Sequence, residues 1–447
     1  MRQDRLLNDF IAHLESLFSI TKSDARKIIA HFHEEMRRGL AGENSSLKMI
    51  PSFVRRPTGT ERGNFLALDL GGTNIRVLSV ALDGRGHAMT QAVSRFVIPG
   101  EVMRGRGDAL FDFIAGSVAS FFEEHDLADH HRYDLAFTFS FPVAQSSVAT
   151  GTLIGWTKGF TASGVEGADV AALLSKAMKR KGLDFVRVAA LTNDTVGTLV
   201  AGCYADPSCD MGVILGTGTN ACYPEKIARI PKYLGPGTSG EMIVNMEWGN
   251  FNGLTENRYD AMLDAASPNA GRQQLEKMVS GLYLGEIARL VIRELMEKGL
   301  LCAGADRFAL SEPYALTTED LSLMAHGHDD FFSGPGFADI SHADRAAIRE
   351  IGRLVAGRSA RIAGAAIVAV LTWVDADLEA DHTVAIDGSL FEKNPEYEFL
   401  IMDTLRDLCG DRAAGIKLVL ARDGSGIGSA IVGAVASMAE RNDSPSI

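Results

Sequence analysis

Two short apolar runs that end in glycine turns constrain this chain more than any other feature. The first lies in residues 65–80, which read FLALDLGGTNIRVLSV, and the second in residues 211–223, which read MGVILGTGTNACY. Each run stops at two close glycines that are followed by Thr and Asn. Because glycine tolerates positive φ and has no side chain, a strand can turn sharply there while its amides approach another group closely. Both turns therefore suit phosphate binding by the backbone.

The residues after the glycines indicate which kind of phosphate loop the first turn could be. A Walker loop needs a Gly-Lys-Ser/Thr ending followed by a helix, and a dinucleotide fingerprint also opens a helix. Neither condition is met, since Ile75, Val77 and Val80 read as a second strand after the turn. Gly71 and Gly72 are therefore expected to close a hairpin between two strands.

Asp69 stands just ahead of the first turn, where a carboxylate could hold a metal ion against the phosphates of ATP. For one copy alone, an ordinary hairpin that contains an Asp is the favoured interpretation, because Gly-rich turns are common. The sequence, however, holds two copies that end in Gly-Thr-Asn, roughly 145 residues apart. They resemble the paired phosphate hairpins of the actin-like ATPase and sugar-kinase superfamily, in which two related halves clamp one nucleotide.

The composition excludes several classes of protein. A chain of 447 residues is long for a single core, so two lobes are expected. The net charge of −13 gives no general attraction to nucleic acid or anionic lipid. Five scattered cysteines argue against a disulfide framework and for a reducing compartment. The N-terminus lacks the apolar core of a signal peptide, and the longest apolar run, residues 362–374, is too short to span a bilayer. A cytoplasmic monomer or homodimer is therefore expected, without a nucleic-acid or membrane partner.

The rest of the chain alternates between helical and strand patterns, which favours a mixed α/β sheet. Residues 6–40 have apolar side chains at helical spacing, with Thr21 or Ser23 as the candidate cap of a second helix. Further helices are expected near residues 108–124, 170–181, 273–298 and 429–441, and further strands near residues 95–98, 134–141, 186–190, 383–386 and 417–421. Ligands of α/β sheets bind at the carboxyl ends of strands, so Asp194, at one such end, is a candidate site residue.

Ten short strings together resemble one family, the hexokinases of eukaryotic type. In chain order they are LKMIPSFV, LALDLGGTNIRVL, FSFPV, LIGWTKGF, TNDTVGTL, GTGTNACY, NMEWGNF, SGLYLGE, DGSL and DGSG. The resemblance runs nearly end to end, and the length resembles that of the single-unit members. It implies an α/β, two-lobed actin-like ATPase (ribonuclease-H-like) fold, with duplicated mixed-sheet domains and a central cleft. The large lobe would hold residues 1–63 and 193–429, and the small lobe residues 64–192 and 430–447.

The resemblance also implies which residues bind a hexose. They are Ser140, Thr157, Lys158, Asn193, Asp194, Asn220, Glu247 and Glu286. A hexose is a ring of hydroxyls, so carboxylates, amides and a hydroxyl that converge from separate loops suit it. Each residue alone has an ordinary explanation. Glu247 could form a surface pair with Trp248, Glu286 could be an exposed helix residue, and Asn220 could be a turn residue. The ordered set of motifs favours the sugar site, with Trp156 and Trp248 as packing residues at its border.

Two of these residues resemble the family's catalytic groups. Asp194 would take the proton from the 6-hydroxyl of the sugar as that oxygen attacks the γ-phosphorus, an effect usually worth about 10²- to 10⁴-fold. Asn193 and Asp194 could also cap a helix that begins near Thr195, and both interpretations can hold together. Lys158 would anchor the sugar and place positive charge near the transferred group, whereas the alternative is a solvated loop lysine.

The nucleotide would lie against both glycine turns and the start of the C-terminal helix. The implied contacts are Asp69, Gly71, Gly72, Thr73, Asn74, Arg76, Gly216, Thr217, Gly218, Asp423, Gly424, Ser425 and Gly426. Asp69 would hold Mg²⁺ through water, since Mg²⁺ keeps much of its hydration shell. One departure from the family is Ile427, which stands where many relatives carry Lys or Arg and so removes a cation near the nucleotide.

The sequence therefore predicts an ATP-dependent hexose 6-phosphotransferase of glycolysis, with ATP and Mg²⁺ as cofactors and glucose as the favoured hexose. The lobes are expected to close only when sugar binds, which assembles the site and excludes water. A catalytically silent sugar sensor is one rival, and the presence of Asp194, Lys158 and Asp69 argues against it. A cytoskeletal or chaperone-like ATPase is another, and the sugar-type cluster argues against that.

Overall fold

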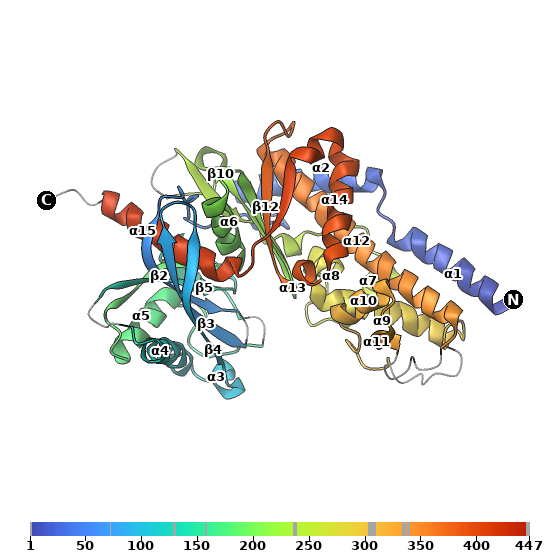
Figure 1. Ribbon diagram of the computed structural model, residues 1–447, viewed down its shortest axis with the longest axis horizontal. Helices are drawn as coiled ribbons and strands as arrows, with labels where there is room; N and C mark the ends of the chain where they lie inside the picture. Colours follow the sequence, from blue (N-terminus) through green and yellow to red (C-terminus); the bar gives the residue numbers. More distant parts are fainter. Residues whose placement is uncertain are drawn as a thin grey trace.

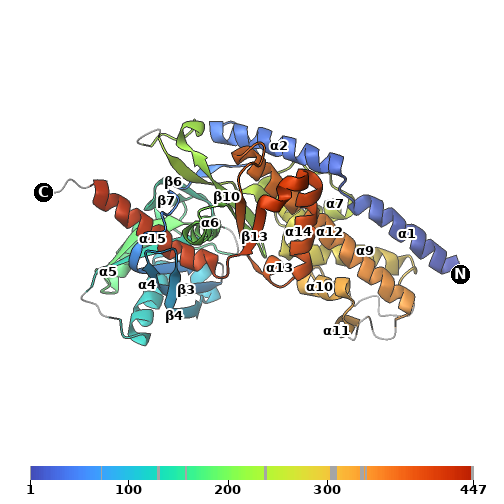
Figure 2. The ribbon, with the colours of Figure 1, turned by 45° about the horizontal axis from the view of Figure 1, so that its top comes forward.

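The computed structural model describes residues 2–71, 73–127, 131–156, 159–235, 239–302, 310–332, 337 and 340–443. Three expected site residues, Gly72, Thr157 and Lys158, lie outside the described residues. The described chain forms two lobes that lie side by side, each built on its own β-sheet (Figure 1, Figure 2). Each sheet has its own core of buried apolar side chains, and a third cluster joins the two sheets.

The five-stranded sheet holds the first glycine turn. Its strands are β2 (Arg62–Leu70), β3 (Asn74–Asp83), β4 (Ala88–Val97), β5 (Tyr133–Phe139) and β8 (Val186–Thr192), in the order β4-β3-β2-β5-β8. Strands β2, β3 and β4 form an antiparallel meander, whereas β5 and β8 run parallel to β2. The hairpin expected between the two strands around the first turn is therefore confirmed, and Asp69 lies opposite Arg76 in its register.

The six-stranded sheet repeats this topology around the second glycine turn. In spatial order its strands are β1 (Ile50–Pro51), β11 (Glu241–Asn245), β10 (Thr219–Lys226), β9 (Cys209–Leu215), β12 (His382–Asp387) and β13 (Ile416–Leu420). Strands β9, β10 and β11 form an antiparallel meander, β12 and β13 run parallel to β9, and β1 is added at the edge. The two halves of the chain thus share one strand order, which confirms the expected duplication.

Helices surround both sheets. Around the five-stranded sheet lie α3 (Gly100–Arg104), α4 (Gly107–Glu124), α5 (Val170–Arg180) and a small hairpin of β6 (Val143–Ser147) and β7 (Thr150–Leu153). The other lobe holds α1 (Arg2–Phe18), α2 (Lys22–Ala41), α7 (Arg258–Ala266), α8 (Gln274–Val279), α9 (Gly281–Glu297), α10 (Thr318–His326), α11 (Asp329–Phe332), α12 (His342–Val374), α13 (Ser389–Glu392), α14 (Pro395–Cys409) and the short turns η1 (Ile227–Arg229), η2 (Trp248–Asn250) and η3 (Gly410–Gly415). Thr21 caps α2 in a capping box with Asp24, so the first of the two candidate caps is the one used.

Helix α12 is longer than the sequence pattern indicates. It runs for 33 residues, whereas the apolar run predicted only its last part, and by length and composition it is long and apolar enough to cross a membrane. Residues 362–374 alone are too short to span a bilayer, but they form only the last part of this helix, so the length argument does not apply to the whole element. In the most apolar window of α12, however, 83% of the residues are buried inside the lobe. Packing in the core accounts for its composition, as in the core helix of a soluble protein.

Two helices pack against each other between the sheets (Figure 1). Helix α6 (Asp194–Ala205) follows β8 and lies on the six-stranded sheet, whereas α15 (Gly424–Asp443) follows β13 and lies on the five-stranded sheet. They approach so closely that a Cβ at Gly428 would collide with the carbonyl oxygen of Gly197. The residues that begin these helices are therefore brought near each other from distant parts of the chain.

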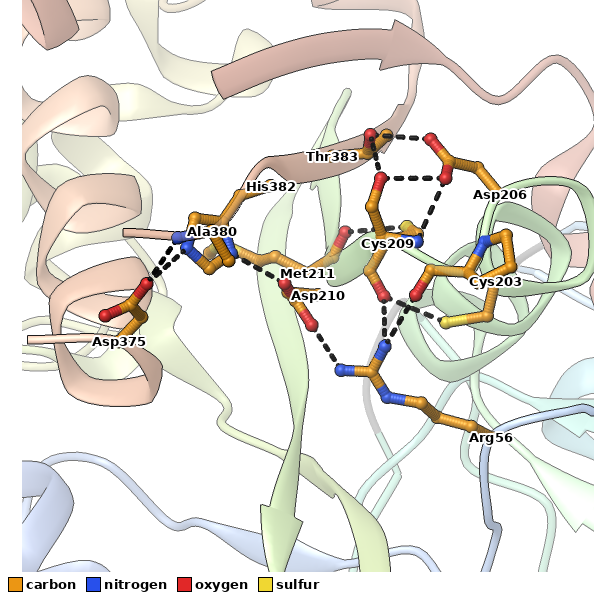
Figure 3. Close-up of polar contacts among 12 residues, drawn as sticks. Arg56, Cys203, Asp206, Cys209, Asp210, Met211, Asp375, Ala380, His382 and Thr383 are labelled. Atoms are coloured by element: carbon orange, nitrogen blue, oxygen red, sulfur yellow. Dashed lines mark hydrogen bonds and ion pairs between the residues drawn. The ribbon is translucent and has the colours of Figure 1, made fainter. Parts of the chain in front are cut away.

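Two connections between the lobes meet at Arg56. This residue lies in the segment that leads from β1 to β2, and its Nη1 donates to the carbonyl oxygen of Cys209 at 2.9 Å, where the chain enters β9 from α6. The guanidinium also pairs with Asp210, the second residue of β9 (Figure 3). One arginine therefore joins both connections.

His382 extends this contact to the end of α12 (Figure 3). Its ring lies 2.6 Å from Asp210 through Nδ1 and 3.3 Å from Asp375, at the end of α12, through Nε2. The pKa of His382 is raised, chiefly by the hydrogen bond to Asp210. We call Arg56, Asp210, His382 and Asp375 the Arg56 cluster. It lies at the amino ends of β9 and β12, opposite the strand ends that carry the expected site residues.

Candidate active site

Asp69 and Arg76 face each other across the first hairpin. Arg76 Nη2 lies 2.8 Å from Asp69 Oδ2, and the side chain of Asp69 is 14% exposed. Burial raises the pKa of Asp69, because the carboxylate loses more hydration than the nearby Arg76 compensates. The charges of Asp194 and Asp423 also raise this pKa. Asp69 therefore lies within electrostatic reach of the first residue of α6 and of the residue before α15.

Arg76 also connects the first hairpin to the start of α15. Its Nη1 pairs with Asp423, and its Nη2 donates to the hydroxyl of Ser425 at 3.3 Å. Asp423 adopts a left-handed backbone conformation with φ of 56°, which places its carboxylate beside the guanidinium. The amide of Ser425 in turn donates to Asp387 Oδ2, at the end of β12, at 3.3 Å. Both strands of the first hairpin, the start of α15 and the end of β12 thus lie together. Asp387, in the last of these segments, is a residue that sequence reasoning missed.

The remaining expected nucleotide residues of the first glycine turn and of the start of α15 lie next to these contacts. Thr73 and Asn74 are exposed, and Asn74 Nδ2 donates to the Thr73 hydroxyl at 3.3 Å. Gly424 begins α15. A Cβ at Gly426 would lie only 3.0 Å from Asp423 Oδ1, so the bare backbone there leaves room for the carboxylate. A Cβ at Gly71 would meet Asp69 Oδ1 at 3.5 Å, which is ordinary contact.

The second glycine turn, Gly216 to Gly218, is closed by a hydrogen bond from the Gly216 amide to the Gly218 carbonyl oxygen at 3.0 Å. A Cβ at Gly216 would lie 3.4 Å from the Cα of Gly388, which follows β12. Gly388 itself has φ of 122°, and a Cβ there would collide with the carbonyl oxygen of Leu215. The close approach of β9 and β12 at this point therefore requires glycine at position 388.

Asp194 is the first residue of α6. The side chain of Asn193 caps this helix by accepting from the amide of Val196 at 2.9 Å, so the capping interpretation is correct. The Thr195 amide donates to Asp194 Oδ1 at 2.8 Å, which orients the carboxylate. Asp194 is half-buried, and its charge reaches Asp69. It therefore lies on the same side of the sheets as the first glycine turn.

Asn220 and Glu247 form one hydrogen-bonded cluster with a third residue. Asn220 Nδ2 donates to Glu247 Oε1 at 3.2 Å and to Asn245 Oδ1 at 2.8 Å, and Asn245 Nδ2 donates to the same Glu247 oxygen at 2.9 Å. Glu247 has a left-handed φ of 56°, which is uncommon for a residue with a side chain. Sequence reasoning missed Asn245, although it lies in the same NMEWGNF motif. Trp248 is fully buried and donates to the Thr219 hydroxyl at 2.9 Å, as expected of a packing residue.

Glu286 forms a buried ion pair with Arg289. It is only 5% exposed, and both its oxygens accept from Arg289, at 2.6 and 2.7 Å. The amide of Tyr314 donates to the same carboxylate at 2.6 Å. Among the described residues, no hydrogen bond joins Glu286 to the Asn220 and Glu247 cluster. The structure therefore replaces the exposed-residue interpretation with a buried ion pair, and it does not bring Glu286 into contact with the other sugar residues.

The described residues that precede and follow Thr157 and Lys158 in the sequence pack through aromatic rings. Trp156 stacks on Phe160 with 5.2 Å between ring centroids, and both rings contact Phe141. Trp156 Nε1 also donates to the carbonyl oxygen of Ala162 at 2.9 Å. Ser140 directly precedes Phe141 and is half-buried. The described residues next to Thr157 and Lys158 therefore share one packing cluster with the neighbour of Ser140.

Comparison with known proteins identifies the family. Two family models, both described as hexokinase, match residues 10–204 and 210–435. The chain belongs to the hexokinase family. It is 43% identical over 428 residues to hexokinase-1 of Nicotiana tabacum, which covers 90% of this chain and 86% of that relative. It is 44% identical over 421 residues to hexokinase-7 of Oryza sativa, which covers 90% of this chain and 91% of that relative.

A solved structure confirms the fold. The hexokinase from Schistosoma mansoni complexed with glucose superposes with a TM-score of 0.86 at 37% identity, covering 96% of this chain and 99% of that one. The duplicated sheets and the two lobes are those of the actin-like ATPase fold, as expected from the sequence. This hexokinase is thus an ATP-dependent phosphotransferase that moves the γ-phosphoryl group of MgATP to the 6-hydroxyl of a hexose, at the entry to glycolysis.

The residues at the first glycine turn suit Mg²⁺ held through water. Arg76 occupies Asp69 Oδ2, whereas Asp69 Oδ1 has no hydrogen bond to any described residue. A partly exposed carboxylate oxygen next to a phosphate turn is a ligand type that Mg²⁺ and its water shell accept. When bound, Mg²⁺ supplies charge that neutralises the phosphate oxygens. In the described part of the chain, no group of three or more His, Cys, Asp or Glu side chains is arranged to hold a metal ion.

Proposed function

We propose that this hexokinase binds glucose between its lobes and uses Asp194 as the general base. The observation that carries the assignment is the contact between the first turns of α6 and α15: a Cβ at Gly197 would lie 2.8 Å from the carbonyl oxygen of Ser425. Arg76 pairs with both Asp423, just before α15, and Asp69, so the helix that begins with Asp194 starts close to the first glycine turn. Glucose is the proposed hexose because it is the sugar bound in the Schistosoma mansoni hexokinase. Competition among glucose, mannose and fructose tests that choice directly.

In the proposed reaction Asp194 accepts the proton of the 6-hydroxyl while the sugar oxygen attacks the γ-phosphorus. The bond from the γ-phosphorus to the oxygen of ADP breaks in the same step, so the electron pair leaves with ADP. Because the Thr195 amide holds Oδ1 of Asp194, Oδ2 is the oxygen that faces the hydroxyl. A base of this kind contributes about 10²- to 10⁴-fold. Lys158 is proposed to place positive charge near the transferred group.

The proposed sugar contacts come from both sides of the site. The first group belongs to the small lobe and consists of Ser140, Thr157 and Lys158. The second group belongs to the large lobe and consists of Asn193, Asp194, Asn220, Glu247 and Glu286. A hexose that bonds to both groups would draw the lobes together, which excludes the water that competes for the phosphoryl group. Glu286 can take part only if the sugar replaces one of its present donors.

The proposed nucleotide contacts are the amides of both glycine turns and the start of α15. They comprise Gly71, Gly72, Thr73, Asn74, Gly216, Thr217, Gly218, Asp423, Gly424, Ser425 and Gly426, with Asp69 as the ligand of hydrated Mg²⁺. Arg76 is a special case, because four of its N–H bonds already point at Asp69, Asp423 and Ser425. A guanidinium has five N–H groups, so one remains for a phosphate oxygen.

The lobe boundaries and the setting of the enzyme are part of the same proposal. The large lobe is proposed to comprise residues 1–63 and 193–429, and the small lobe residues 64–192 and 430–447. The last boundary falls inside the continuous helix α15, whose first turns contact α6 and whose later residues join the core between the sheets. We further propose a cytoplasmic monomer or homodimer without nucleic-acid or membrane partners, an expectation that the burial of α12 supports.

A coupled assay for glucose 6-phosphate tests the function. Product should appear with ATP, Mg²⁺ and glucose and should be absent when any one is omitted. A protein that binds glucose without forming product would instead be a sugar sensor. Tryptophan emission on addition of glucose reports on closure, because Trp156 lies next to Thr157 and Lys158. An unchanged spectrum with active enzyme would contradict the closure, though not the phosphoryl transfer.

A further inference from the structure

Asn245 contacts two of the expected sugar residues, Asn220 and Glu247, on the face of the sheet that carries the start of α6. It is the last residue of β11 and stands directly opposite Cys222 of β10. Residues directly opposite each other in an antiparallel pair share a face of the sheet, as do residues two apart on one strand. Asn220 therefore shares this face with Asn245. Cys222 Sγ, on the same face, donates to the carbonyl oxygen of Thr195 at 3.1 Å, in the first turn of α6.

The backbone decides which way the side-chain amide of Asn220 points. Its Oδ1 accepts from the amides of Ala221 and Trp248, at 2.8 and 3.3 Å. Because both of these donors need an oxygen, Nδ2 of Asn220 must lie on the other side of the amide. There it donates to Asn245 Oδ1 and Glu247 Oε1, at 2.8 and 3.2 Å. The direction of this amide is thus set before any ligand binds.

The same reasoning fixes the amide of Asn245. Because its Oδ1 receives a hydrogen from Asn220, its Nδ2 is turned toward Glu247 and donates to Oε1 at 2.9 Å. Oε1 of Glu247 thus has two donors, both uncharged, whereas Oε2 accepts from no described residue. Glu247 is half-buried and has the left-handed φ of 56°. Two amides therefore hold one oxygen of this carboxylate and leave the other to a ligand.

We propose that Asn245 is a positioning residue that aims Oε2 of Glu247 at the hydroxyls of the hexose. Without it, Oε1 would keep only the longer bond from Asn220, and the carboxylate would be free to rotate. As a neutral donor, Asn245 fixes the carboxylate and leaves it its charge, whereas Arg289 pairs with the charge of Glu286. The inference rests on the proposed sugar contact of Glu247 and adds the group that gives this contact its direction.

Removal of the Asn245 side chain should weaken sugar binding selectively. Asn245→Ala takes one of the two donors from Glu247 and should raise the KM for glucose about tenfold, with kcat and the KM for MgATP within about threefold of wild type. Calorimetric titration with glucose alone should show a matching loss of affinity. Asn250→Ala is the matched control, because Asn250 Nδ2 donates to the backbone carbonyl oxygen of Glu247, at 3.3 Å, and not to its carboxylate. Its KM for glucose should stay within about twofold of wild type.

Asn245→Asp separates positioning from packing. The new side chain has nearly the same size and still accepts from Asn220, but it sets a second carboxylate against Oε1 of Glu247. At about pH 8 both carboxylates should be ionised, so the KM for glucose should exceed that of Asn245→Ala. Toward about pH 6 a proton shared by the two carboxylates restores a donor, so this KM should fall about threefold or more. Asn245→Ala gives the baseline over this pH range, because Asp194 and Glu276 lie near the same site in both variants.

An unchanged KM for glucose in Asn245→Ala would overturn the inference, as would an equal rise in the KM for MgATP. An equal rise in the KM for glucose of Asn250→Ala would also overturn it, since loosening of the whole motif would then explain the loss. A KM for glucose of Asn245→Asp that does not fall relative to the baseline would contradict it too. If Asn245→Ala does not fold, wild type serves as that baseline. Absence of product with wild-type enzyme would instead refute the proposed function.

Discussion

The two halves of the chain share one strand order but carry different residues at equivalent strand ends. The penultimate residue of the first strand is Asp69 in β2 and Ile214 in β9. The helix after the fifth strand begins with Asp194 in the first half and directly follows Asp423 in the second. The duplicated topology thus supplies two similar corners, and only the first has a carboxylate at the end of the strand that leads into its glycine turn.

The two carboxylates at the helix starts, Asp194 and Asp423, have different surroundings. Asp423 is paired with Arg76, which belongs to the other half of the chain. No lysine or arginine of the described residues pairs with Asp194, whose Oδ1 accepts only from Thr195. A carboxylate bound to a guanidinium is a poor proton acceptor, because its charge and lone pairs are already engaged. If the proposed role of Asp194 is correct, one half of the fold uses this position for catalysis and the other uses it for an ion pair between the halves.

The largest expected effect tests whether the two carboxylates are interchangeable. Asp194→Asn should lower kcat by about 10²- to 10⁴-fold while glucose binding, followed by tryptophan emission, is largely kept. Asp423→Asn, at the corresponding position of the other half, should lower kcat less than about tenfold. Steady-state rates of both variants decide the question. Equal losses of kcat would contradict the division of roles, and wild-type turnover of Asp194→Asn would refute the assigned base.

The next effect concerns the close contact between α6 and α15, the equivalent helices of the two halves. Gly428→Ala should lower the free energy of unfolding by about 2 to 3 kcal/mol, since the new methyl group would collide with the carbonyl oxygen of Gly197. Gly433→Ala on the same helix is the control, because its Cβ would meet Ala136 at an ordinary 3.4 Å. This control should raise the free energy of unfolding by up to about 1 kcal/mol, because alanine has a higher helix propensity than glycine. Urea unfolding measures the free energy of unfolding of both variants. Changes of the same sign in the two variants would contradict the close contact between the helices.

Removal of Arg76, which joins the two halves of the chain, should lower the free energy of unfolding somewhat less. Arg76→Met leaves the carboxylates of Asp69 and Asp423 without their cation and should lower the free energy of unfolding by about 2 kcal/mol. Arg95→Met offers a control, since Arg95 is the register partner of Arg76 on β4 and is exposed. Its effect should stay within about 0.5 kcal/mol. Equal denaturation midpoints for the two variants would show that Arg76 does not connect the halves.

The smallest effect concerns the Arg56 cluster. The pKa of His382 is raised by Asp210 and, less strongly, by Asp375, so the folded protein holds this proton more tightly than the unfolded chain. The resulting stability is complete below pH 6.5, the ordinary value, and is lost as the pH rises through the higher folded-state pKa. From pH 6.5 upward, stability should therefore fall more steeply in wild type than in His382→Asn. Parallel slopes in the two proteins would remove His382 from this account.

Much of the fold could be predicted because the informative signals are local. The glycine turns, the alternation of apolar residues and the Thr21 cap all act within a few residues, and each is where the sequence placed it. The first part of α12 was missed although Ile348, Ile351 and Val355 recur there at helical spacing, a signal that was present and not used. A helix buried on most sides loses the one-sided pattern by which helices are recognised.

The site could be predicted in its residues more than in its contacts. Arg76 and Asp423 are 347 positions apart, and nothing in either segment indicates that they pair. The Glu286 and Arg289 pair, in contrast, has helical i,i+3 spacing, a signal that was present and not used. Asn245 and Asp387 were missed because each lies at a strand end where its role depends on the neighbouring strand. Pairings between distant segments follow from topology, which local patterns do not contain.

The central claim is that both halves present the nucleotide to a sugar whose 6-hydroxyl lies on Asp194. A crystal structure of the enzyme with glucose, Mg²⁺ and a non-hydrolysable ATP analogue tests it most directly. The account predicts an Asp194 carboxylate oxygen within about 3.2 Å of the sugar 6-oxygen, with the γ-phosphate between the two glycine turns. A 6-oxygen bonded to another side chain, or phosphates bound away from either turn, would contradict it.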